Sequence, residues 1–88
     1  MISAENLIVH ELIGLKTEVQ ESSNPQIIGV NGKIVDETKH MFLLLTKNGF
    51  KMLEKKHNKW RFFLHDQKIS VSGSLLGKRA YERLVSKN

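Results

Sequence analysis

Residues 41–72 read MFLLLTKNGFKMLEKKHNKWRFFLHDQKISVS, and this stretch decides the fold. Apolar residues alternate with others on both sides of Asn48-Gly49, a pair that predicts a tight β-hairpin turn. A two-residue loop at this position pairs Lys47 with Phe50. One face of the hairpin then carries four apolar residues, Leu43, Leu45, Phe50 and Met52. The stretch therefore predicts antiparallel strands.

The alternation continues after the hairpin, over Trp60–His65 and Lys68–Ser72. A turn over Lys56–Lys59 separates the first of these strands from the hairpin, and Asp66-Gln67 makes the next turn. Because side chains of a strand alternate between its two faces, one face collects the apolar residues. The residues expected to point inward are Trp60, Phe62, Leu64, Ile69 and Val71.

The same period of two extends towards the amino terminus. Residues 13–20 alternate and predict a half-buried strand, and Ser22–Pro25 predicts a loop. For residues 27–37 we predict one long strand bent at Gly32, because a continuous strand keeps its apolar residues in phase. Short strands with tight turns indicate an all-β fold of about six strands, closed into a small antiparallel barrel over about residues 12–72.

Both ends of the chain carry helical patterns. Ser3 can cap a short helix over about residues 4–10, with an apolar stripe of Leu7, Ile8 and Leu12. A second helix is expected over about residues 75–86. We expect the amino-terminal stripe either to contact a protein partner or to plug this protein's own barrel.

The composition indicates one small intracellular domain. The chain has 88 residues, 40% of them hydrophobic, and no cysteine, which excludes disulfides and thiolate zinc sites. Its longest purely apolar run, Met41–Leu45, is too short to span a bilayer. The first residues lack the basic start of a secretory signal, so we expect a cytoplasmic protein, residues 1–88 being a single domain.

Positive charge is concentrated in the middle and at the end of the chain. The net charge is +5, made up of −3 over residues 1–46, +5 over residues 47–61 and +3 over residues 62–88. A basic stretch with interleaved aromatic residues is typical of a polyanion-binding surface, and a solvated lysine-rich hairpin is the competing interpretation. The residues expected to contact the phosphates of such a polyanion are Lys33, Lys51, Lys55, Lys56, Lys59, Arg61, Lys78, Arg79 and Arg83.

Three aromatic residues of this region, Trp60, Phe62 and Phe63, can be interpreted as stacking partners for bases or as core residues. In-phase burial favours the core for Trp60 and Phe62. The four histidines are far apart in the sequence, and Asp36-Glu37 point to opposite faces of a strand. Neither set has the spacing of a metal site or of a two-carboxylate acid/base pair, so we expect no active site in this chain.

Three ordered segments resemble the archaeal ribonuclease P protein component 1 family. They are Glu11-Leu12-Ile13-Gly14-Leu15, the segment from Gly29 through Gly32-Lys33-Ile34-Val35-Asp36-Glu37-Thr38, and the segment from Gly73-Ser74-Leu75-Leu76-Gly77-Lys78-Arg79 to Glu82-Arg83. The resemblance runs from about Glu5 to Leu84. It implies an Sm-like fold, a strongly bent barrel with helices at its ends, in which Gly32, Glu37 and Thr38 have structural roles.

The resemblance also implies a function. Members of the family are protein subunits of ribonuclease P, which matures the 5′ end of precursor tRNA. The catalyst is the RNA subunit, with Mg²⁺ held by RNA, so this chain is expected to need no cofactor of its own. Its implied partners are the ribonuclease P RNA, a zinc-ribbon protein subunit and, indirectly, precursor tRNA.

Two other hypotheses remain. One is an Sm-like or SH3-like RNA-binding barrel of another ribonucleoprotein, such as a ribosomal protein or an RNA chaperone, which ring formation in solution would distinguish. The other is a small metal-dependent nuclease, which requires clustered carboxylates or histidines. The sequence offers no such cluster.

Overall fold

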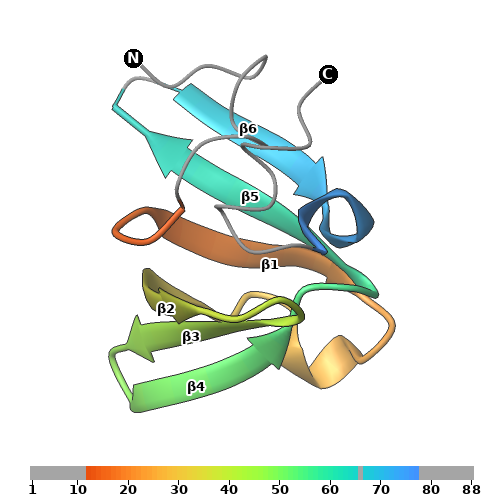
Figure 1. The fold of residues 1–88 in the computed structure, drawn as a ribbon, viewed down its shortest axis with the longest axis horizontal. Helices are drawn as coiled ribbons and strands as arrows, with labels where there is room; N and C mark the ends of the chain where they lie inside the picture. The colour runs from red at the N-terminus through yellow and green to blue at the C-terminus, as the bar shows by residue number, and fades with distance from the viewer. Residues whose placement is uncertain (1–11, 66, 78–88) are drawn as a thin grey trace.

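The computed structural model describes residues 12–65 and 67–77, which form one antiparallel β-sheet and two short 3₁₀ turns (Figure 1). The strands are β1 (Lys16–Ser22), β2 (Asn31–Glu37), β3 (Met41–Thr46), β4 (Gly49–Glu54), β5 (Asn58–Leu64) and β6 (Gln67–Ser72). The 3₁₀ turns are η2 (Pro25–Ile27) and η3 (Gly73–Leu76). The predicted all-β class with six antiparallel strands is confirmed.

The sheet is open and does not close into a barrel. Its strand order is β4-β3-β2-β1-β5-β6, and within the described residues the edge strands β4 and β6 do not pair with each other. Figure 1 shows β5 and β6 on one side of β1, and β2, β3 and β4 on the other. The prediction of closure is wrong, because even strand spacing sets the number of strands but does not make the two edges meet.

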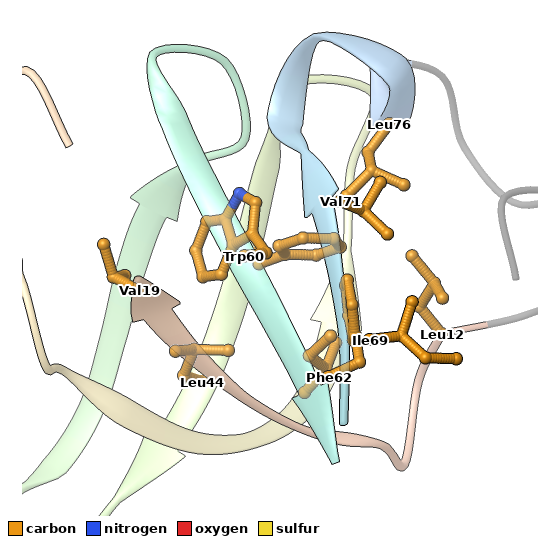
Figure 2. Packing of buried hydrophobic residues seen from close by; sticks show 10 residues of the cluster. Leu12, Val19, Leu44, Trp60, Phe62, Ile69, Val71 and Leu76 are labelled. Atoms are coloured by element: carbon orange, nitrogen blue, oxygen red, sulfur yellow. The ribbon is translucent and has the colours of Figure 1, made fainter. Parts of the chain in front are cut away.

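One apolar cluster lies against one face of this sheet. Its buried members are Leu12, Val19, Ile34, Phe42, Leu44, Trp60, Phe62, Ile69, Val71 and Leu76. Figure 2 shows Trp60 near the centre of the cluster, with Val19 and Leu44 on one side and Leu76 on the other. The rings of Trp60 and Phe42 meet edge to face at 5.1 Å, a favourable geometry. All inward residues predicted within 60–72 belong to this core or pack against it.

The predicted long strand over residues 27–37 is wrong in its first part. Asn24 accepts a hydrogen bond from the Gln26 N–H at 3.1 Å and caps the turn η2, and Gly29 has a φ of +91°. These two local features end the extended conformation, so the strand starts at Asn31 and Ile28 is 49% exposed. The alternating apolar residues of 27–30 favour a strand, but the turn-forming residues Asn24 and Gly29 decide the conformation here.

The hairpin between β3 and β4 is confirmed, but its register is shifted by two residues. Phe50 pairs with Leu45 and not with Lys47. The turn consists of Lys47 and Asn48 and is followed by Gly49 at a φ of +107°, the glycine position of a hairpin with a bulge. Because a shift of two residues preserves the faces, the four predicted apolar residues still share one side.

That shared side faces away from the core. Phe42 and Leu44 are the β3 residues that enter the core, so their neighbours Leu43 and Leu45 lie on the opposite face, which is called the outer face below. Across the hairpin, Phe50 is 67% exposed and Met52 is 55% exposed.

Towards both ends of the chain, the structure differs from the prediction or does not describe the residues concerned. The first strand starts at Lys16, three residues later than predicted. The predicted amino-terminal helix, about 4–10, lies outside the described residues. Of the predicted carboxy-terminal helix, about 75–86, the structure describes only the start, where Leu75 and Leu76 belong to η3.

Candidate nucleic-acid interface

The residues predicted to contact RNA do not form one surface. Lys33 on β2 and Lys51 on β4 are both exposed, but they project from different sides. Lys51 lies opposite Leu44, whose side chain enters the core, whereas Lys33 lies opposite Leu45 on the outer face. Lys56 is exposed in the turn between β4 and β5. Three more, Lys78, Arg79 and Arg83, lie outside the described residues.

Lys51 borders a pocket of about 410 Å³ beside the hairpin turn. The other lining residues are Ile28, Gly29, Val30, Asn31, Thr46, Lys47 and Asn48. Its two lysines, Lys47 and Lys51, give this pocket a positive wall. Leu43, Leu45, Phe50 and Met52 of the outer face do not line this pocket.

Lys55 differs most from its prediction. Its side chain is 1% exposed, and its ammonium donates a hydrogen bond to Glu37 Oε2 at 2.6 Å and to the Lys39 carbonyl at 3.3 Å. The ammonium also lies 5.0 Å from the centre of the Phe42 ring. A side chain held in this way cannot reach a phosphate without breaking a buried ion pair, so the prediction of an RNA contact is wrong for Lys55.

Lys59 and Arg61 lie on the outer face of β5, each beside a glutamate of β1. The Lys59 ammonium is 3.9 Å from Glu21 Oε2, and the Arg61 guanidinium is 3.4 Å from Glu18 Oε1. These pairs are partly exposed to solvent, where an ion pair contributes about 0–1 kcal/mol. The glutamates nevertheless cancel much of the positive charge of this part of β5.

A row of outward-facing residues crosses the whole sheet next to these pairs. Each member is the cross-strand partner of the next. The row, called the cross-sheet row below, runs through Lys68, Phe63, Lys16, Lys33, Leu45 and Phe50, from β6 to β4. It contains three lysines and no acid, and none of these lysines takes part in the ion pairs found among the described residues.

Phe63 lies between two lysines in this row. The Lys68 ammonium is 5.8 Å and the Lys16 ammonium 6.0 Å from the centre of its ring. Such exposed cation–π contacts contribute about 0.5–1 kcal/mol each. Lys16 and Lys68 were not among the residues predicted to contact RNA. Their alternation with Thr17 and Ile69 was the signal that places them on the outer face.

Of the three residues predicted to contact a protein partner, the structure describes only Leu12. Leu12 is fully buried in the core, where it packs with the other cluster members. Its role is therefore to fill this domain's own core, the second of the two expected roles. Leu7 and Ile8 lie outside the described residues.

The three residues expected to be structural all lie at close contacts. Gly32 faces the β3 backbone so closely that an added Cβ would clash with the Leu45 carbonyl. Glu37 holds Lys55, as described above. Thr38 closes the turn between β2 and β3, since its N–H donates to the Met41 carbonyl at 2.9 Å and its hydroxyl accepts from the Met41 N–H at 3.0 Å.

Two further chemical features can be stated for the described part of the chain. No group of three His, Asp or Glu side chains there is placed to hold a metal ion. Over the same residues, no helix has the length and apolar character needed to cross a bilayer.

Comparisons with known proteins agree with the resemblance. The family model "Ribonuclease P/MRP, subunit p29" matches residues 5–86. Ribonuclease P protein component 1 of Nitrosopumilus maritimus is 45% identical over 87 residues, covering 99% of both chains. The protein of the same name from Methanocaldococcus jannaschii is 40% identical over 88 residues, covering 99% of this chain and 93% of the relative.

A solved structure, Mth11, described as a homologue of human RNase P protein Rpp29, superposes with a TM-score of 0.59. It is 28% identical, and the match covers 83% of this chain and 96% of the other. The fold of this chain therefore matches that of the solved Rpp29 homologue. Both sequence and structure lead to one conclusion: the chain belongs to the ribonuclease P/MRP p29 family and is a protein subunit of ribonuclease P.

Proposed function

We propose that this subunit binds the ribonuclease P RNA with the outer face of its sheet and so supports 5′-end maturation of precursor tRNA. The observation that supports this most is the pairing of Lys16 with Lys33 on neighbouring strands, without an acid in their row. Like charges directly opposite each other destabilise a sheet. A phosphate bound between the two ammonium groups attracts both and offsets this repulsion. Contacts between lysines and phosphates hold the RNA in position without reading its sequence.

In this proposal the chain contributes binding and no catalytic group. Hydrolysis belongs to the RNA subunit and the Mg²⁺ that the RNA holds, and precursor tRNA is contacted indirectly. Membership of the p29 family favours this hypothesis over a barrel of another ribonucleoprotein and over a metal-dependent nuclease.

The other basic residues predicted to contact RNA contribute less to the proposed binding. Lys59 and Arg61 can exchange their exposed carboxylate partners for phosphates at small cost. Lys51 and Lys56 would meet RNA only where it bends around the hairpin, since they lie off the cross-sheet row. Lys78, Arg79 and Arg83 are proposed on their sequence pattern alone.

A salt series tests the RNA-binding face. Each phosphate that a lysine neutralises adds about −0.7 to −0.9 to the slope of log K against log salt concentration. We expect a double substitution, Lys16→Gln with Lys33→Gln, to flatten this slope by about 1.4–1.8. The measurement is the affinity for the cognate ribonuclease P RNA at several salt concentrations.

Lys39→Gln is the matched control, because Lys39 is an exposed lysine in the turn after β2 and away from the row. Its slope should stay that of the wild type. If Lys39→Gln flattens the slope as much per charge as the double substitution does, binding follows net charge and the outer face is not the RNA site.

We further propose that the protein partner is the zinc-ribbon subunit of ribonuclease P, as the resemblance implies. Leu7 and Ile8 are the residues proposed to contact it, from their apolar spacing in the sequence. Glu5 and Glu11, close to them in the sequence, also favour a protein over RNA as their partner.

Replacing Leu7 and Ile8 with serine is expected to weaken binding of the zinc-ribbon subunit about tenfold or more, because two apolar contacts are lost. Affinity for the RNA should not change. Calorimetric titration with the zinc-ribbon subunit measures the first effect. Met52→Ser tests the exposed apolar side of the hairpin in parallel, and a loss of partner binding only in Met52→Ser would move the contact to β4.

A further inference from the structure

We propose that the cross-sheet row binds an unpaired segment of RNA, with one base stacked on Phe63 and the phosphates on either side of that base held by Lys16 and Lys68. This inference rests on the proposed function, the binding of RNA by the outer face. It adds which structural state of RNA the face selects and which residue makes the selection.

Phe63 points away from the core. Its ring lies on the outer face of β5 and is only half-buried, whereas its neighbour Phe62 is fully buried in the core. Phe63 therefore contributes little to the core. The residues paired with it on both sides, Lys68 on β6 and Lys16 on β1, are exposed lysines. A partly exposed aromatic ring between two cations is an arrangement that can hold a base and its flanking phosphates.

Lys16 and Lys68 both contact the Phe63 ring. Both ammonium groups lie near 6 Å from the Phe63 ring centre, at the outer limit of a cation–π contact. They surround the ring with positive charge but are not fixed by carboxylates in the described residues. Phosphates can draw both lysines aside, and the ring is then open to a base.

The selection of unpaired RNA follows from stacking geometry. In a duplex each base is covered by its neighbours, so a ring fixed on the outer face of the sheet has no free base face to contact. A-form RNA also presents a deep, narrow major groove that side chains do not enter. An unpaired base can turn its face to the sheet, as bases do on other sheet platforms that carry aromatic residues.

A pocket beside the Phe63 ring can receive the edge of the stacked base. It has a volume of about 460 Å³, within the range of small-ligand sites, and is open to solvent. Besides Phe63 and Lys68 it is lined by Leu64, His65 and Gln67. His65 and Gln67 carry nitrogen and oxygen groups that can donate or accept hydrogen bonds at a base edge.

The other end of the row extends the track. Lys33, Leu45 and Phe50 continue it across β2, β3 and β4, and Phe50 is the most exposed large apolar residue described. Phe63 and Phe50 are four strand spacings apart, about 19 Å along the sheet. Several nucleotides of unpaired RNA can thus lie between the two rings with lysines beneath them.

Fluorescence anisotropy with labelled oligouridine and a labelled RNA duplex of similar length tests the proposal. Wild-type protein should bind the oligouridine more tightly than the duplex. Phe63→Leu, which keeps an apolar side chain on the strand, should weaken oligouridine binding about 5- to 150-fold and duplex binding less than about twofold. Phe63→Trp should restore the affinity. Met52→Ala, on the same face but off the row, is the matched control and should bind like the wild type.

Lys16→Gln with Lys68→Gln is a second variant, in case changes at Phe63 disturb the sheet. It should lose oligouridine affinity and give a flatter salt slope. Equal oligouridine affinity for Phe63→Leu and wild type, or equal wild-type affinity for single strand and duplex, overturns the inference. The proposed function then still stands if the ribonuclease P RNA binds with the salt slope expected above, and it fails separately if that RNA does not bind.

Discussion

Replacing Lys55 with methionine is expected to lower the free energy of unfolding by about 3–5 kcal/mol. Methionine is similar in length and fills the space, but it removes the ammonium that lies 2.6 Å from Glu37 Oε2. The Glu37 side chain is only 2% exposed, so its charge loses that partner where water cannot replace it. Small domains have total stabilities of about 5–15 kcal/mol, which makes this loss a large fraction of the whole.

Urea unfolding followed by circular dichroism measures this effect. Lys56→Met is the matched control, because the neighbouring lysine is exposed and its replacement should change stability by less than about 0.5 kcal/mol. Adding Glu37→Gln to Lys55→Met should recover part of the loss, since the buried negative charge is then removed as well. Equal stabilities of Lys55→Met and Lys56→Met would contradict the structural role of the pair.

The error about Lys55 shows a limit of local sequence patterns. Lys55 stands in a basic run with Lys51, Lys56 and Lys59, and nothing in the run distinguishes it from its neighbours. What buries it is Glu37, 18 residues earlier, which the antiparallel pairing of β2, β3 and β4 brings beside it. A contact made through two strand pairings has no signal in the local sequence.

Features with a local cause were predicted well. The inward positions of Trp60, Phe62, Ile69 and Val71 follow from alternation alone, and the structure confirms them. The hairpin was found from the Asn48-Gly49 pair and the alternation on both sides of it. Its register was not, because Gly49 takes a bulge position after the turn and not a central turn position.

The candidate site was less predictable because charge was summed along the chain. Residues 1–46 have a net negative charge, and of this segment Lys33 but not Lys16 was predicted to contact RNA. In the folded sheet, Lys16 lies between Phe63 and Lys33, and Glu18 lies one row away beside Arg61. Pairing across strands, and not position in the sequence, decides which charges act together.

Gly73→Ala is the other substitution with a large expected effect. A Cβ at Gly73 would overlap the Lys55 carbonyl and crowd the Asn58 carbonyl, both of which are backbone atoms. The Lys55 carbonyl already accepts a hydrogen bond from the Trp60 indole at 3.0 Å in the centre of the core. Making room for a methyl group therefore displaces η3 or breaks that buried bond, and we expect a loss of about 3 kcal/mol or more.

Gly77→Ala separates this clash from a general effect of replacing glycine. Gly77 has a φ of −72°, and a Cβ there would meet no atom closer than the Ser74 carbonyl at 3.8 Å. Its replacement should be neutral or stabilise by up to about 1 kcal/mol, because alanine restricts the unfolded chain. Thermal unfolding of both variants makes the comparison, in which Gly73→Ala should melt more than about 10 °C lower than Gly77→Ala. Similar melting temperatures would mean that η3 can move away from Lys55 without cost. The packing of Gly73 on Lys55 would then not be what joins η3 to the turn between β4 and β5.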